Sequence, residues 1–175
     1  MVHNPKKYLY FVFCILFLSC SNNNDHRNLD NTAKEFNSIK ESMERVNILL
    51  IKSEEDDIAN YVKRYGLNVK KTERGVRYEI YHKTSSRRIR QRDKVTVVYR
   101  LKLINGYVAY DKNKPESFII GKMSIRGLEE GLQMMGEGEK AIIIVPSYLG
   151  YGVAGDDNKI PPRATLIYDI AVLKV

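Results

Sequence analysis

Histidine and cysteine, the side chains that most often act as nucleophiles, bases or metal ligands, are scarce in this sequence. The chain has three histidines, His3, His26 and His82, and two cysteines, Cys14 and Cys20. They provide neither a Ser-His-Asp nor a Cys-His nucleophile set, and they lack the paired His/Cys spacing of a zinc site. We therefore predict no metal and no cofactor. An enzyme built from this chain needs a reaction without a nucleophile.

The segment YGVAGDDNKIPPRATLIYDI, Tyr151 to Ile170, combines loop and strand signals. It begins with Tyr-Gly, continues through acidic residues and a proline pair, and ends in a run with β-strand composition. Proline has a preset φ and no N–H, so Pro161 and Pro162 fix the angle at which the loop enters the strand. Taken alone, the pair is also explained as the end of a loop before an edge strand.

Residues 1–19 have the layout of a secretory signal peptide. Lys6 and Lys7 precede an apolar run that is short for a membrane span, and the small Ser19 stands before Cys20. The ending Leu-Phe-Leu-Ser-Cys resembles a bacterial lipobox, which implies cleavage before Cys20 and a diacylglycerol on its sulfur. A plain signal peptide with an incidental cysteine is the alternative. We expect a lipid-anchored protein of the bacterial cell envelope, on the periplasmic face of the outer membrane.

A tether and a helical region are expected after the leader. Residues 20–31 are polar and Asn-rich, and they predict a flexible tether that follows the lipidated cysteine. Within 32–66, Ser53 and the acidic residues after it predict an N-cap and a second helix that ends at Gly66, so we expect a helical hairpin. The first helix has an apolar stripe at spacings of three and four residues: Phe36, Ile39, Met43, Val46 and Leu50. This stripe packs on the following domain or pairs with a second copy in a homodimer.

A periodicity of two begins at Leu67 and predicts one domain over 67–175. An Asn-Gly turn at 105–106 predicts a hairpin, and one short helix is expected over 125–135. Strands are expected over 75–82, 94–104, 116–120, 140–146 and 164–175. The predicted fold class is α+β, with a mostly antiparallel sheet that covers the short helix.

The net charge of +8 is unevenly distributed. Segment 83–94, KTSSRRIRQRDK, holds six basic residues and one acidic residue, which accounts for most of the balance. This run is interpreted as a solvated segment that protects a strand edge, or as a surface for anionic membranes or an acidic partner. We expect no nucleic acid partner for an exported protein.

Three consecutive motifs resemble the FKBP-type peptidyl-prolyl isomerases. They are IRGLEEGLQMMGEGEKAIIIVP from Ile125, YLGYG from Tyr148, and IPPRATLIYDIAVLKV from Ile160. The resemblance covers residues 75–175, and the N-terminal parts also resemble the gliding-motility-associated lipoprotein branch of the family. The family fold implies a five- to six-stranded antiparallel sheet half-wrapped around a short helix, with proline bound between them.

The reaction that this resemblance implies fits the residue inventory. Rotation about an X-Pro bond must cross a barrier of about 18–20 kcal/mol that amide resonance sets. The twisted amide is less polar than the planar one, and a dry apolar pocket accommodates it better than water does. No bond breaks, so neither a base nor a nucleophile is needed.

The resemblance assigns the pocket one position at a time. In the family, the hydroxyl at the position of Tyr151 and the backbone N–H at that of Ile125 hold ligand carbonyls. The catalytic positions are matched by Tyr99, Tyr110, Asp111, Tyr151 and Tyr168, and the substrate-binding positions by Phe118, Ile125, Leu128 and Ile160. Two of these tyrosines, Tyr110 and Tyr168, stand where the family usually has Phe.

Other positions depart further from the family pattern. Leu128 replaces the Trp of the pocket floor, which predicts weak binding of macrolide inhibitors. Glu116 falls where an aromatic residue often stands. The Arg that usually pairs with the pocket Asp has no counterpart, so Lys112 or Lys114 is the candidate partner of Asp111.

Three functions follow from these observations. The first is a membrane-tethered isomerase that assists the folding of exported, proline-containing polypeptides. The second is a chaperone or scaffold that keeps the peptide groove with little or no turnover. The third is a structural subunit of a motility or secretion assembly. The pocket residues favour the first function, and the Leu128 floor favours the second.

Overall fold

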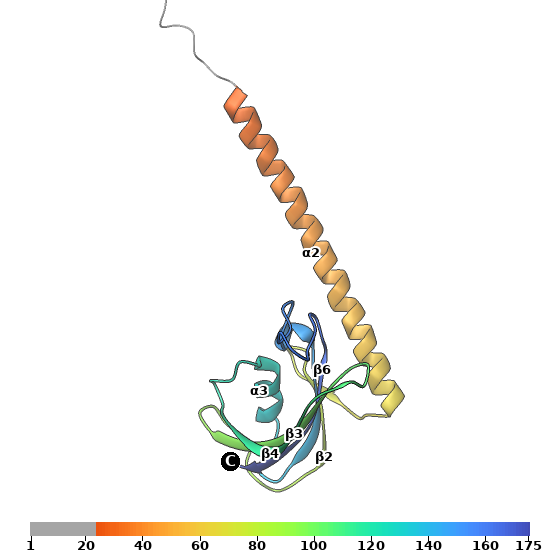
Figure 1. Cartoon of the computed structure of the whole chain (residues 1–175), viewed down its shortest axis with the longest axis vertical. Helices are drawn as coiled ribbons and strands as arrows, with labels where there is room; N and C mark the ends of the chain where they lie inside the picture. Colours follow the sequence, from red (N-terminus) through yellow and green to blue (C-terminus); the bar gives the residue numbers. More distant parts are fainter. Residues whose placement is uncertain (1–23) are drawn as a thin grey trace, which may run out of the picture. The chain divides into compact units, whose positions relative to one another are not determined.

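A computed structural model describes residues 24–175, with side chains described at Thr32 and from Lys34 onward. One long helix precedes a curved sheet, and a short helix lies against that sheet (Figure 1). The elements are α2 (Asn24–Tyr65), β1 (Lys70–Lys71), β2 (Arg77–His82), β3 (Lys94–Leu103), β4 (Val108–Ile119), α3 (Arg126–Gln133), β5 (Lys140–Val145), the 3-10 helix η2 (Ser147–Leu149) and β6 (Leu166–Lys174).

The N-terminal helical region is one continuous helix of 42 residues, so the predicted hairpin is wrong. No Gly or Pro occurs between Asn24 and Tyr65, and a serine in a helix interior costs too little helix propensity to end it. Ser53 therefore lies inside α2. The helix ends where predicted, because Gly66 adopts a left-handed φ of 62° and the N–H of Leu67 donates to the carbonyl of Val62.

The N-terminal end of α2 differs from the predicted tether. The helix begins at Asn24, inside the range 20–31 that was expected to be flexible. Residues 1–23, with the leader and the candidate lipidation site Cys20, lie outside the described residues. Within residues 24–175, no helix combines the length and the hydrophobicity needed to span a membrane.

The sheet has six strands in the order β1-β2-β5-β6-β3-β4, and all of its strand pairs are antiparallel. This confirms the α+β class with an antiparallel sheet around a short helix. The predicted Asn105-Gly106 turn joins β3 to β4. Strand β4 is longer than expected, because the short strand predicted over 116–120 is the end of one strand that starts at Val108.

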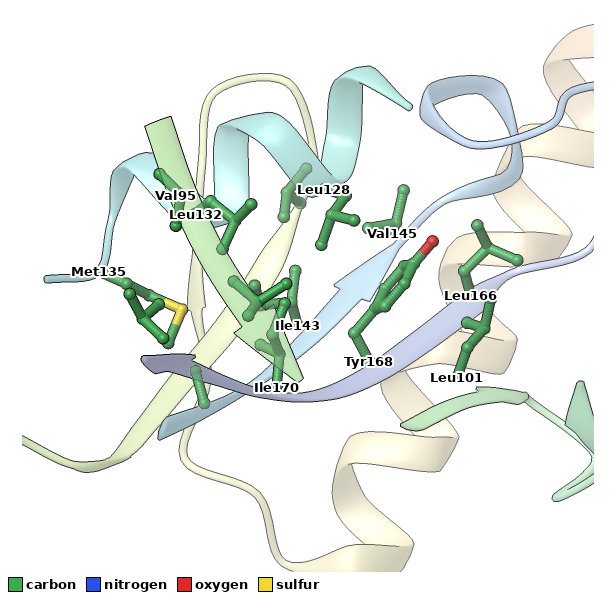
Figure 2. Packing of buried hydrophobic residues seen from close by; sticks show 14 of the residues in the cluster. Val95, Leu101, Leu128, Leu132, Met135, Ile143, Val145, Leu166, Tyr168 and Ile170 are labelled. Atoms are coloured by element: carbon green, nitrogen blue, oxygen red, sulfur yellow. The ribbon is translucent and has the colours of Figure 1, made fainter. Parts of the chain in front are cut away.

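The main core fills the space between α3 and one face of the sheet. Leu128 and Leu132 of α3 face Ile143, Val145, Tyr168 and Ile170 of the central strands (Figure 2). Gly131 makes this close approach possible, since a Cβ there would lie 2.6 Å from the Cγ2 of Ile143. The short helix is therefore held at a fixed distance above β5 and β6.

A second, smaller core lies on the opposite face of the sheet. Residues 49–175 form one compact unit, and within it Ile58 of α2 is fully buried with Ile144 and Ile167. These two sheet residues alternate with Ile143 and Tyr168 along β5 and β6, so they point away from α3. The C-terminal part of α2 thus covers the sheet face that α3 leaves uncovered.

Candidate active site

A cavity of about 570 Å³ opens between α3 and the sheet. Its lining is supplied by β3, β4, β6, α3, the segment before α3 and the loop that precedes β6. Seven of the nine residues predicted from the sequence line it: Tyr99, Tyr110, Phe118, Ile125, Leu128, Tyr151 and Tyr168. Ile160 is buried in the main core, in contact with this group, and only Asp111 lies elsewhere.

Tyr99 and Tyr168 form the aromatic wall above the sheet. Their rings meet edge to face with centroids 5.6 Å apart, which is a favoured geometry for aromatic pairs. Burial raises the pKa of the Tyr168 hydroxyl well above its ordinary value, and the neighbouring Tyr151 and Tyr99 add to the effect. The wall is therefore neutral at any physiological pH.

Residues 148–164 form the loop over the cavity, which we call the cavity loop. The carboxylate of Asp156 holds its backbone in place by hydrogen bonds. One oxygen of Asp156 accepts the N–H groups of Asn158 at 3.0 Å, Lys159 at 2.9 Å and Ile160 at 2.7 Å. Its other oxygen accepts the hydroxyl of Tyr110. The cavity loop is thus tied to β4 at the cavity wall, with Ile160 directed into the core.

Sequence reasoning did not single out Asp156. The available signal was an Asp inside a Gly-rich loop, because Asp side chains commonly bond backbone N–H groups two or more residues ahead. The hydroxyl of Tyr110, which replaces the usual Phe, has a clear role in the structure as the donor to this carboxylate.

Known proteins share both the sequence pattern and this fold. The pattern of the family described as FKBP-type peptidyl-prolyl cis-trans isomerase matches residues 85–173. The chain belongs to this family.

Two relatives and one solved structure illustrate the similarity. The chain is 37% identical over 113 residues to a Haemophilus influenzae protein named "Probable FKBP-type peptidyl-prolyl cis-trans isomerase", covering 63% of this chain and 46% of that protein. It is 36% identical over 111 residues to the Neisseria meningitidis protein of that name called FkpA, covering 61% of this chain and 40% of that protein. The matches thus span less than half the length of these relatives. The crystal structure of FkpA from Escherichia coli has a TM-score of 0.59 at 26% identity, covering 99% of this chain and 83% of that chain.

The floor of this FKBP domain is aliphatic. Leu128 lies in the first turn of α3 and is buried against the main core. Ile125 precedes the helix as its extended N-cap residue, with φ −94° and ψ 96°. The carboxylate of Glu129 accepts the N–H of Gly121 at 2.8 Å and that of Met123 at 3.3 Å. Glu129, which sequence reasoning missed, therefore orders the segment that brings Ile125 to the cavity.

Asp111 does not reach the cavity of this FKBP domain, contrary to its predicted place among the catalytic residues. It lies directly opposite Arg100 in the β3–β4 ladder and pairs with it at 2.7 Å. Successive residues of a strand point to opposite faces, so Tyr110 faces inward and Asp111 outward. Its partner is Arg100, whereas Lys112 or Lys114 was expected.

Glu116 is the carboxylate that the structure brings into the cavity instead. It accepts the hydroxyl of Tyr99 at 3.1 Å and pairs with Lys112 at 2.9 Å. Burial raises the pKa of Tyr99, and the nearby Glu116 raises it further. The sequence marked Glu116 only as an acid in place of an aromatic residue, so its partnership with Tyr99 was not foreseen.

No candidate metal site accompanies this cavity. Among the described residues, no group of three or more His, Cys, Asp or Glu side chains is placed to hold a metal ion. The side chains that line the cavity can bind and orient a peptide, exclude water from it and donate hydrogen bonds.

Proposed function

We propose that this chain catalyses cis-trans isomerisation of X-Pro bonds in polypeptide clients. The observation that carries the proposal is the cavity between α3 and the sheet, walled by tyrosines above an aliphatic floor. The proline ring enters this cavity and its amide twists out of water. An apolar, desolvated environment disfavours the planar, resonance-stabilised amide relative to the twisted one. The barrier falls without any covalent step.

The residues of the wall act by holding the peptide. Burial raises the pKa of Tyr151, with a further contribution from Asp156, so its hydroxyl remains a donor at neutral pH. It donates to a substrate carbonyl, and the backbone N–H of Ile125 donates to another. Leu128 supports the proline ring from below, and positioning of this kind reduces the entropic cost of reaching the transition state.

Isomerase activity is tested by NMR exchange spectroscopy on an X-Pro peptide, with and without the chain lacking residues 1–20. We expect accelerated cis-trans exchange, and a loss of at least about tenfold in Tyr151→Phe, because one oriented hydrogen bond to the carbonyl is worth roughly 1.4 kcal/mol. Asp111→Asn is the matched control outside the cavity and keeps its rate. Uncatalysed exchange in a folded wild-type sample refutes the proposal.

The second candidate is a peptide-binding chaperone or scaffold of a motility or secretion assembly. Two features favour it. Leu128 makes the floor less aromatic than the Trp of the family would, and the hydroxyls of Tyr110 and Tyr168 make the wall more polar than Phe side chains would. In the same experiment it predicts peptide shift changes with no accelerated exchange.

We infer that the enzyme works on exported proteins from a lipid anchor in the bacterial envelope. The leader over 1–19 and the Leu-Phe-Leu-Ser-Cys ending support this localisation. Replacing Cys20→Ser should release the protein from the membrane fraction and abolish palmitate labelling. Unchanged fractionation would place the anchor elsewhere, with the basic segment 83–94 as the next candidate.

A further inference from the structure

Glu54 of α2 reaches the two ends of the cavity loop. One carboxylate oxygen accepts the backbone N–H of Ser147 at 2.6 Å and the hydroxyl of Thr165 at 2.6 Å. The other oxygen accepts the Ser147 hydroxyl at 2.9 Å. Ser147 and Thr165 are both buried, and all three residues belong to the same compact unit. The carboxylate is thus the shared acceptor for three donors.

These two partners flank the segment that covers the cavity. Ser147 comes directly before residues 148–164 and Thr165 directly after them. The carbonyl of Ser147 accepts the N–H groups of Gly150 at 3.0 Å and Gly152 at 2.8 Å, so it fixes the backbone on both sides of Tyr151. A displacement of Ser147 would therefore be passed directly to the Tyr151 hydroxyl.

Glu54 is itself held in place by its neighbours on α2. Ile58, one turn further along, is fully buried against the outer face of the sheet. The adjacent Glu55 accepts from Lys71 at 2.6 Å and also pairs with Arg77. The Glu54 carboxylate is therefore presented from a fixed part of the helix, outside the cavity loop.

We propose that Glu54 is a positioning residue of the isomerase site, through which α2 sets the place of the cavity loop. The inference rests on the proposed isomerase function. Without the carboxylate, Ser147 loses two acceptors and Thr165 loses one, and burial leaves little water to replace them. The cavity loop then samples positions in which Tyr151 no longer lines the cavity and Ile160 is no longer held in the core. The peptide binds more weakly, while the bound state still reacts.

The test compares Glu54→Ala with Glu55→Gln in the chain lacking residues 1–20. Glu55→Gln is the control on the same helix, because the Glu55 carboxylate accepts hydrogen bonds from Lys71 and Arg77 of the strands, whereas Glu54 bonds the ends of the cavity loop. For Glu54→Ala we expect the KM for an X-Pro peptide to rise about tenfold with kcat little changed. We also expect the Gly152 amide to exchange with solvent about ten times faster. Glu55→Gln should change neither quantity by more than about twofold.

Thr165→Val provides a second variant in case Glu54→Ala does not fold. It removes one donor and keeps the side-chain shape, so a partial effect on KM and on Gly152 exchange is expected. Equal effects of the Glu54 and Glu55 variants, or unchanged Gly152 exchange in both Glu54→Ala and Thr165→Val, overturn the inference. The amide exchange needs no substrate, so it still decides the role of Glu54 if the wild type shows no isomerase activity.

Discussion

At the scale of single residues, Leu128 presents a branched aliphatic side chain at the floor of the cavity. A tryptophan at this position would add area and an aromatic face worth about 0.5–1.5 kcal/mol beyond burial. Tyr99, Tyr110 and Tyr168 still line the cavity, so under the proposed function we expect short proline peptides to keep these wall contacts. We therefore expect the aliphatic floor to lower the affinity mainly of large ligands that rest on it.

Leu128→Trp should raise the affinity for a macrolide inhibitor by about tenfold, or about 1.4 kcal/mol, and raise peptide turnover much less. Calorimetric titration of both forms measures the change. Overpacking against the main core can cost about 1–3 kcal/mol, so the melting temperature must be followed in parallel. Tight binding by the natural protein, or no gain in a well-folded variant, would mean that residue 128 is not the floor.

Asp156 should make the stability of the cavity loop dependent on pH in the acid range. Burial alone raises the pKa of Asp156, but the donors from Tyr110, Ile160, Asn158 and Lys159 outweigh it, and the net shift is downward from 3.8. A folded pKa below the unfolded one means that the contribution is complete above about pH 5 and is lost as the pH falls through the folded pKa.

The measurement is the melting temperature of wild type and Asp156→Asn from pH 7 to pH 2. We expect the wild type to be more stable above pH 5, with a difference that shrinks below pH 3.8 and disappears at the acid end. If the difference in melting temperature stays constant over the whole range, the stabilisation comes from the shape of the Asp156 side chain and not from its charge.

The residues around the cavity show what could and what could not be predicted from the sequence. The inward-facing tyrosines could be identified from motif and alternation, because a strand alternates regardless of its partners. The same alternation also places Asp111, the neighbour of Tyr110, on the outer face, but the partnership of Glu116 with Tyr99 could not be predicted. Between Val97 and Tyr99 the register with β4 shifts, so Val97 lies opposite Glu116 while Tyr99 lies opposite Lys112. Such an irregularity depends on the strand partner and leaves no signal in the sequence.

At the scale of elements, α2 shows how a local signal can mislead. Ser53 followed by acidic residues has the composition of a helix start, yet no breaker separates it from the preceding turns. The antiparallel sheet and the short helix were predictable, because alternation, the Asn-Gly turn and the Gly-bounded segment all agree with one fold class. The strand order was not predicted, since it depends on pairings between strands that lie far apart in the sequence. The hairpin failed because the cap signal was the only evidence for an interruption.

Ser53→Ala distinguishes the two arrangements by the sign of its effect. In a continuous helix, alanine has the higher propensity and should stabilise the protein by about 0.5 kcal/mol or leave it unchanged. At an N-cap, the same change should cost about 1 kcal/mol. Urea unfolding of both forms gives the difference, and a clear loss of stability would restore the hairpin.

At the scale of the whole molecule, α2 exposes an apolar stripe. Phe36 is 67% exposed, Met43 64% and Val46 53%, and Ile39 and Leu50 continue the same spacing. A helix stripe at spacings of three and four is self-complementary when a second copy presents the same stripe. A homodimer through α2 is the partner that we propose for this surface.

Analytical ultracentrifugation tests the homodimer. We expect the chain lacking residues 1–20 to sediment as a dimer at micromolar concentration, and Met43→Glu to sediment as a monomer because it places a charge in the stripe. Lys34→Glu, on the face of the same helix opposite to the stripe, is the control and should remain dimeric. A monomeric wild type would rule out this pairing.

The basic segment 83–94 has a partly structural role. Arg88 pairs at 2.8 Å with the buried Glu139, which also accepts the N–H of Gly136, and Arg87 pairs with Asp93 at 2.7 Å. Because the carboxylate of Glu139 is buried, losing its paired cation would cost more stability than losing the partner of an exposed carboxylate. For the remaining basic residues both roles stay predictions: a solvated segment that protects a strand edge, or a surface for anionic membranes or an acidic partner.

The central claim, that the cavity above Leu128 isomerises X-Pro bonds, is tested most directly by one NMR titration with methyl labels on Ile and Leu. A single X-Pro peptide sample reports both its exchange rate and the protein methyl groups that it contacts. We predict accelerated exchange together with shifts at Leu128, Ile125 and Ile160, and none at Ile58 and Ile167 on the opposite face of the sheet. Accelerated exchange without shifts at the cavity methyl groups, or shifts there with no acceleration, would contradict the claim.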